Sequence, residues 1–302
     1  MHIAASGYQQ FQDYAFFPLY PLFIKLLNII FNNPVFSGIV ISNISFLLFL
    51  FFLHRYVKTK FSDSIAKNTV LTYLFFPTAF YTTIVYSESL FLLFLILFFL
   101  FLENKKYSQM IVFAMFAQLT RFIGIFLVIS AFIKIVKNQK LEKDLIFVPL
   151  SALGTLIYSA FQWQKEGDAL AFVKAQAFWL RFPQDPVSTI FSYLWNIFNF
   201  KLLPTMDYLD LTVTLVFIGL LIANIRKIKG SLWAFSIIVL LIPSSTGTLT
   251  SMPRYVLASL GTFIIIGKIL SEKPYLKIPI WTIMLFAQII LFAFFINGYW
   301  IS

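Results

Sequence analysis

The chain has 302 residues, of which 60% are hydrophobic and 12% are charged. Soluble globular domains carry about 25% charged residues, so this composition excludes a soluble enzyme and indicates an integral membrane protein. The absence of Cys excludes disulfides and thiolate metal sites, and two His leave little basis for a histidine metal cluster. The net charge of +11 comes from basic residues scattered between apolar runs, so we expect membrane topology rather than a nucleic-acid partner to explain it.

Apolar runs bounded by charged or turn residues predict an all-α, polytopic transmembrane bundle with about ten membrane segments, each needing about 20 residues to cross. The predicted segments are 35–53, 68–82, 88–102, 108–120, 122–136, 145–161, 209–225, 231–249, 255–270 and 278–298. Several are short, and we expect broken or re-entrant helices around Pro77 and Arg121. The apolar stretches 16–32 and 187–203 contain Pro, Asn or Lys and are predicted to lie at the membrane interface.

Lys and Arg are divided unequally between the two sides of this topology. Of the 23 basic residues, 16 fall on one side and seven on the other, so the first side is expected to be cytoplasmic. Because no long repeat is visible, we expect one polytopic domain over 1–302. Its parts are an outer loop with an interfacial helix at 1–34, helices at 35–161, a long outer loop with an interfacial helix at 162–208, and helices at 209–302.

Ionisable groups on the expected outer face are the first candidates for function, because a charge beside hydrocarbon is costly. Asp13 lies in a polar, aromatic-rich segment, where it is also compatible with a solvated loop acid. Glu88 begins an apolar helix, where a carboxylate also complements the positive end of the helix dipole. Arg121 interrupts a long uncharged stretch and either snorkels to the interface or binds an anion.

Two further outer residues, Arg254 and Asp168, complete the candidate set. Arg254 and Arg121 at the mouth of a helical bundle are suited to hold the phosphate of a lipid-linked substrate. Asp168 belongs to a segment whose acids, bases and aromatics suit either a sugar site or a solvated face. We assign no role to His2 and His54, and we predict no metal site. No cofactor is predicted with certainty, and a divalent metal has no support in the sequence.

Five segments resemble, in order along the chain, the PIG-V family of mannosyltransferases. They are 7–22, 77–91, 119–125, 167–179 and 253–260, and the most specific letters among them are FFPLYP and FPTAF…YSESLF. The family is of the GT-C class, and its eukaryotic members add the second mannose of the glycosylphosphatidylinositol (GPI) anchor. The resemblance implies transfer of mannose from a polyprenyl or dolichyl phosphate to a glycolipid or related acceptor, at the extracytoplasmic face and with inversion at the anomeric carbon.

The resemblance also implies roles for the candidate residues. A carboxylate acts as general base on the acceptor hydroxyl, and arginines stabilise the departing phosphate. We therefore expect Arg121 and Arg254 to bind phosphate. Glu88 and Asp13 are expected to contact the acceptor or the sugar, and Asp168 is a weaker candidate.

The family pattern places a Trp-Asp pair shortly before I-A-x-x-G-Y, and its Asp is the expected catalytic carboxylate. Residues 3–8 match the end of that motif, but the chain begins at Met1. We therefore expect an N-terminally truncated member in which Asp13 is a weak substitute for the catalytic Asp.

Two alternatives to a transferase remain open at this point. A lipid-linked sugar flippase or transporter would also be polytopic, but transporters usually show repeats and a midplane site, which favours the transferase. A non-catalytic membrane subunit is the second alternative, because the expected Trp-Asp pair is missing. The expected partners are membrane lipids, a polyprenyl-phosphate-linked mannose donor and a glycolipid acceptor, in the plasma membrane of a prokaryote or the endoplasmic reticulum of a eukaryote.

Overall fold

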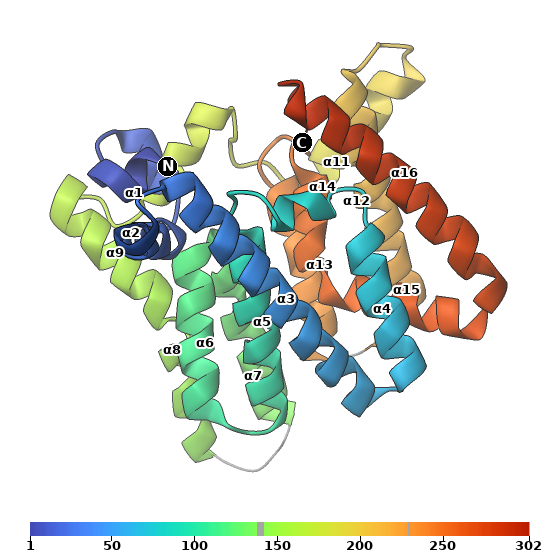
Figure 1. The fold of residues 1–302 in the computed structure, drawn as a ribbon, viewed down its shortest axis with the longest axis horizontal. Coiled ribbons are helices and arrows are strands. Elements are labelled where there is room, and N and C mark those ends of the chain that lie inside the picture. The colour runs from blue at the N-terminus through green and yellow to red at the C-terminus, as the bar shows by residue number, and fades with distance from the viewer. Residues whose placement is uncertain (138–141, 229, 302) are drawn as a thin grey trace. The chain divides into compact units, whose positions relative to one another are not determined.

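The computed structural model describes residues 1–137, 142–228 and 230–301, drawn in Figure 1. It is 79% helical, and the described residues form no β-strand, which confirms the all-α prediction. The chain divides into two compact units, Met1–Phe52 with Thr82–Arg181 and Leu53–Tyr81 with Phe182–Ser302. The single polytopic domain expected over 1–302 remains a prediction.

The first unit contains the N-terminal segments and the helices from α5 to α10. Its α-helices are α1 (His2–Ser6), α2 (Leu19–Phe31), the first part of α3 (Pro34–Lys60), α5 (Glu88–Glu103), α6 (Tyr107–Thr120), α7 (Leu127–Lys137), α8 (Phe147–Leu150), α9 (Leu153–Glu166) and α10 (Ala171–Lys174). Its 3-10 helices are η1 (Phe11–Ala15), η3 (Phe122–Phe126), η4 (Glu142–Ile146) and η5 (Ala175–Trp179).

Helix α5 is a largely buried helix of the first unit, and its sequence between the two terminal Glu residues is apolar on almost every face. Twelve of its 16 residues are buried, as expected for a helix without a polar side. It runs side by side with α6 in Figure 1. Helix α6 packs in turn on α9, where the buried Gln118 side chain donates to the carbonyl of Ser151 and accepts from the amide of Thr155 at 2.9 Å.

The second unit contains the C-terminal helices and the helix that follows α3. Its elements are the last part of α3, α4 (Asp63–Phe75), α11 (Pro186–Phe198), α12 (Thr205–Ala223), α13 (Ser231–Ser244), α14 (Met252–Tyr255), η6 (Val256–Ala258), α15 (Leu260–Glu272), η7 (Pro274–Leu276) and α16 (Lys277–Ile296). Its core joins α4 to α15, where the rings of Tyr73 and Phe263 stack with centroids 3.7 Å apart. The short helix η2 (Ala79–Thr82) contains the point in the sequence, between Tyr81 and Thr82, where the chain passes from the second unit to the first.

The expected helix breaks at Pro77 and Arg121 are confirmed. Helix α4 ends at Phe75, and Phe76 takes the extended conformation that a following proline favours. Helix α6 ends at Thr120, and Arg121 is extended. The stretches 16–32 and 187–203 overlap the helices α2 and α11, which end at Phe31 and Phe198, while their position at a membrane interface remains a prediction.

The expected number of about ten membrane segments is not confirmed. Among the described residues, three helices are long and apolar enough to span a membrane, Pro34–Lys60, Thr205–Ala223 and Pro274–Ile296. Two bent pairs, Lys143–Leu150 with Leu153–Glu166 and Met252–Ala258 with Leu260–Glu272, raise the number to five if each is one span. The predicted segments 88–102 and 108–120 lie in helices of 16 and 14 residues, and of the segment 231–249 only residues 231–244 form a helix, of 14 residues. Such helices are about 21–24 Å long, less than the hydrocarbon thickness of about 30 Å.

Candidate functional site

Glu88 and Arg121, predicted separately as site residues, form an ion pair within the first unit. Arg121 Nη1 lies 2.7 Å from Glu88 Oε1. The Glu88 side chain is 3% exposed and that of Arg121 17% exposed, so solvent screens this pair little. A charge taken out of water needs a partner, and each of these residues supplies the other with one.

The carboxylate of Glu88 is positioned by the start of α5 and by contacts from α3. Glu88 is the first residue of α5, where the helix dipole favours a negative charge. The loop before it is held through its backbone: Asn43 Nδ2 donates to the carbonyl of Thr83 at 2.8 Å, and Ser42 Oγ donates to that of Tyr86 at 3.1 Å. Residues on α3 therefore set where α5 begins.

Tyr20 on α2 is held next to α3, within electrostatic range of the Glu88 carboxylate. Its hydroxyl lies 2.7 Å from Ser42 Oγ and 3.1 Å from the carbonyl oxygen of Gly38. Burial raises the pKa of Tyr20 to about 12, and the negative charge of Glu88 acts in the same direction. Tyr20 is consequently a neutral hydrogen-bonding group at physiological pH.

Arg121 is positioned by the sharp turn between α6 and η3. Its backbone is extended, with φ −151° and ψ 143°, and η3 begins at the next residue. The turn requires glycine three residues later: a Cβ at Gly124 would lie 2.8 Å from the carbonyl carbon of Ala117 and from the amide nitrogen of Gln118. Because those are backbone atoms of α6, they cannot move aside cheaply.

The residues flanking Arg121 are anchored in an aromatic cluster formed by Phe17, Tyr158 and Phe172. Leu119 and Phe122 both pack against this cluster. The ring centroids of Phe122 and Phe172 are 5.4 Å apart, and those of Phe17 and Tyr158 are 4.6 Å apart. The backbone that carries the guanidinium is thus held on both sides of Arg121.

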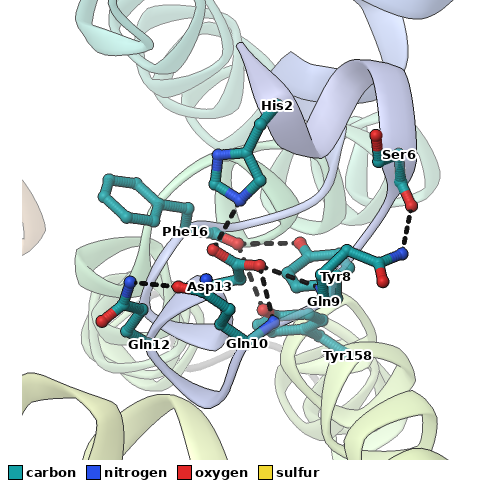
Figure 2. A network of polar contacts seen from close by, with 9 residues as sticks. All are labelled: His2, Ser6, Tyr8, Gln9, Gln10, Gln12, Asp13, Phe16 and Tyr158. Atoms are coloured by element: carbon teal, nitrogen blue, oxygen red, sulfur yellow. Dashed lines mark hydrogen bonds and ion pairs between the residues drawn. The ribbon is translucent and has the colours of Figure 1, made fainter.

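Asp13 lies in a separate hydrogen-bond network of the first unit, shown in Figure 2. Its side chain is 1% exposed, and its Oδ2 accepts from the amides of Gln9 and Gln10 at 2.9 and 3.0 Å. Its Oδ1 lies 2.7 Å from His2 Nε2. Burial opposes ionisation, but the hydrogen bonds from Gln10, Gln9 and His2 outweigh it and lower the pKa of Asp13.

These contacts give Asp13 the geometry of an anchor. Both carboxylate oxygens are engaged with the chain, joining α1, through His2, to the loop at Gln9 and Gln10. A lowered pKa also makes a carboxylate a weaker base. The contact from His2, to which the sequence assigned no role, could not be anticipated from two residues 11 positions apart. Catalysis by Asp13 remains a prediction.

Replacing Asp13 by Asn is expected to lower the melting temperature at pH 7. Each hydrogen bond to a charged group contributes about 1.5–3 kcal/mol to the free energy of unfolding. The pKa of Asp13 is lower in the folded chain than in the unfolded chain. The stabilisation that the Asp13 carboxylate contributes is therefore fully present above its unfolded pKa of about 3.9 and is lost as the pH falls through its folded pKa. The difference between wild type and variant in detergent should therefore shrink below about pH 4. An unchanged melting temperature with mannose transfer lost would instead identify Asp13 as the base.

An aromatic group next to this network was not anticipated. The rings of Tyr8 and Tyr14 stack with centroids 5.1 Å apart, and the Tyr14 hydroxyl donates to Glu166 Oε1 at 2.8 Å. Burial, followed by the bond to Glu166, raises the pKa of Tyr14 to about 12. The Tyr158 hydroxyl donates to the carbonyl of Tyr14 at 2.9 Å. The only sequence signal was the high density of aromatic residues around 7–21.

Asp168 makes local contacts in the turn that follows α9. Its Oδ2 lies 2.7 Å from Lys174 Nζ, and its Oδ1 accepts from the amide of Leu170 at 3.0 Å. The hydrogen bond from Lys174, with that from Leu170, lowers the pKa of Asp168. The Lys174 side chain is 67% exposed, so this is a surface ion pair, of a kind that contributes little stability.

Arg254 belongs to the second unit and lies on α14. Its guanidinium carbon is 4.8 Å from the ring centroid of Tyr81, a cation–π contact. Tyr81 is held by a bond from its hydroxyl to the carbonyl of Ile301 at 2.6 Å. The neighbouring Pro253 carbonyl accepts from Thr78 Oγ1. Within its unit, Arg254 is therefore placed against an ordered aromatic ring.

The helices and the buried ion pair define an all-α membrane protein in which a carboxylate at the start of an apolar helix holds an arginine at a helix break. No group of three or more His, Asp or Glu placed as metal ligands occurs in the described parts of the chain.

The chain belongs to the PIG-V family of mannosyltransferases, whose family model, described as Mannosyltransferase (PIG-V), matches residues 1–198. This match confirms the resemblance found in the sequence, and mannosyl transfer is the chemistry of the family. The matched residues contain four of the five candidates, which are Asp13, Glu88, Arg121 and Asp168. Arg254 lies outside the match. No curated protein and no solved structure shows a significant similarity to the chain.

Proposed function

We propose that the protein transfers mannose from a polyprenyl or dolichyl phosphate donor to a glycolipid acceptor at the extracytoplasmic face. The observation that carries this proposal is the buried ion pair between Glu88 and Arg121. A lipid phosphate is the leaving group in such a reaction, and an oriented guanidinium stabilises the negative charge that develops on it. Membership of a mannosyltransferase family supports mannose as the sugar that is transferred.

In the proposed reaction, an acceptor hydroxyl oxygen attacks the anomeric carbon of mannose while the bond from that carbon to the phosphate oxygen breaks. The hydroxyl proton passes to a carboxylate, and the lipid phosphate leaves with the electron pair. Attack opposite to the leaving group inverts the anomeric configuration. The sequence predicts Asp13 only as a weak substitute for the catalytic Asp of the family, and the Asp13→Asn variant distinguishes that role from anchoring.

The role that we assign to Glu88 is to orient Arg121. A guanidinium has five N–H groups in a rigid plane, so one bond to a fixed carboxylate sets the direction in which the others point. Glu88 is fixed by α3 and by the start of α5, and Arg121 by the turn at Gly124. We expect the donor phosphate to approach this guanidinium.

A second ion pair supports the proposed orientation in the membrane. Glu103 is the last residue of α5, and its Oε2 lies 2.5 Å from Lys134 Nζ. The two pairs therefore mark opposite ends of α5, separated by about 24 Å of helix. The excess of Lys and Arg on one side favours a cytoplasmic position for Glu103 and Lys134 and an outer position for Glu88 and Arg121.

The proposal is tested by reconstituting the chain in lipid vesicles with a mannosyl-phosphoryl polyprenol labelled in the sugar. We expect label to move into a glycolipid acceptor, with an anomeric configuration in the product opposite to that of the donor. Label that crosses the bilayer still attached to its lipid would identify a flippase. Label that stays in place, with the wild-type chain folded and membrane inserted, would identify a non-catalytic subunit.

A further inference from the structure

The first unit contains an apolar cavity of about 380 Å³ between its N-terminal segment and α9. This volume lies in the range of small-molecule sites, about 300–1,000 Å³. Its wall comes from α1, the first turns of α2, the end of α6 and α9, and consists almost entirely of aliphatic and aromatic side chains. Lys25 is the single charged residue of the wall.

The tyrosines of the wall contribute mainly their rings. The Tyr8 hydroxyl donates to the carbonyl of Phe16 at 2.7 Å, and the Tyr158 hydroxyl donates to that of Tyr14 at 2.9 Å. A hydrophilic ligand would therefore lose its hydrogen bonds to water and gain few in this cavity. The wall suits a hydrocarbon chain.

The cavity is continuous with exposed apolar surface. Leu22 and Ile157 line it and are 47% and 50% exposed. Further along α2, Leu26 and Ile29 follow Leu22 at helical spacing and are 52% and 75% exposed. In a membrane protein such a face is covered by lipid, so a chain can enter the cavity laterally from the bilayer.

Lys25 gives the cavity one positive charge. Over the parts of the chain that the structure describes, no carboxylate forms an ion pair with it. A single ammonium matches the single negative charge of a phosphodiester. The cavity wall contains neither Glu88 nor Arg121, the residues proposed to meet the donor phosphate.

We infer that this cavity binds an anionic phospholipid of the surrounding bilayer, with one acyl chain between α2 and α9 and its phosphate at Lys25. Bilayer phospholipid is in large excess over any lipid-linked sugar, so mass action favours it at a site open to the membrane. This inference goes beyond the proposed function, because binding requires no transfer of mannose.

The test is photo-crosslinking of the full chain in vesicles, with phosphatidylglycerol that carries a diazirine in one acyl chain, followed by mass spectrometric mapping of the labelled peptides. We expect labelling of α2 and α9 near Leu22 and Ile157. Lys25→Gln should reduce it about fivefold, the effect of one basic residue on an anionic lipid. Leu22→Trp, which fills the cavity at an exposed position, should abolish it.

The matched control is Lys165→Gln, which removes an exposed lysine of the same unit that does not line the cavity and should leave labelling unchanged. Labelling of the lipid-exposed helix α16 reports insertion of every variant. Equal labelling by diazirine phosphatidylcholine, unaffected by Lys25→Gln, would overturn the inference. Preferential labelling by an equimolar diazirine polyprenyl phosphate would overturn it in favour of a donor chain. Neither readout depends on transferase activity, so the two proposals fail separately.

Discussion

Replacing Arg121 by Ala is expected to lower mannose transfer about 100-fold or more, the cost of removing one preorganised group that stabilises developing negative charge. The guanidinium lies 2.7 Å from Glu88 Oε1 and is proposed to meet the departing phosphate. The measurement is the initial rate of label transfer in reconstituted vesicles, normalised to the amount of inserted protein. Full activity would remove the assigned role.

Loss of activity alone does not separate chemistry from folding, because Arg121→Ala leaves the Glu88 carboxylate buried. Removing one partner of a buried pair typically costs about 3–5 kcal/mol. The double variant Glu88→Gln with Arg121→Gln removes both charges together and should restore much of the lost stability. It should remain inactive if Arg121 acts on the phosphate. A double variant that recovered both melting temperature and transfer would identify the pair as purely structural.

The ion pair of Glu103 and Lys134 offers the matched control. It lies in the same unit and joins Glu103, the last residue of α5, to Lys134 in the last turn of α7, with side chains 19% and 25% exposed. The double replacement by Gln should lower the melting temperature modestly and leave transfer per folded molecule unchanged. A comparable loss of transfer in that variant would show that the assay reports stability rather than the site.

The second large effect is expected for Gly124→Ala. The added Cβ would meet backbone atoms of Ala117 and Gln118 at 2.8 Å, so α6 and η3 must separate. Overpacking of this kind costs about 1–3 kcal/mol. The movement also displaces Arg121, and a misplacement of about 1 Å at a reacting centre can lower a rate about 100-fold. Melting temperature and transfer rate should therefore fall together.

Gly219→Ala is the control for this substitution. Gly219 lies within α12, and nothing comes within 4 Å of a Cβ placed there. Alanine in a helix interior is more stable than glycine by about 0.5–1 kcal/mol, so the variant should melt at the same or a higher temperature. If Gly124→Ala behaved like Gly219→Ala, the close turn would not be what positions Arg121.

Much of the local structure was readable from single residue types. Pro77 favours an extended residue before it, and α4 does stop at Phe75. Arg121 in an apolar stretch indicated a break, and α6 ends just before it. The length of each helix was less readable, because an apolar run does not reveal where a 3-10 turn interrupts it. For that reason 122–136 became η3 followed by α7 rather than one membrane segment.

Composition and local pattern predicted an all-α membrane chain and the positions of two helix breaks, and five short segments carried the resemblance to the family that the family model confirms. These features depend on residues close together in the sequence. The pairing of Glu88 with Arg121, the bond from His2 to Asp13 and the cavity beside Lys25 arise only in the folded unit. Each of these features joins side chains from different segments of the chain. The packing of helices is set by steric fit across many residues, such as the close contact at Gly124. No local pattern of hydrophobicity encodes that fit.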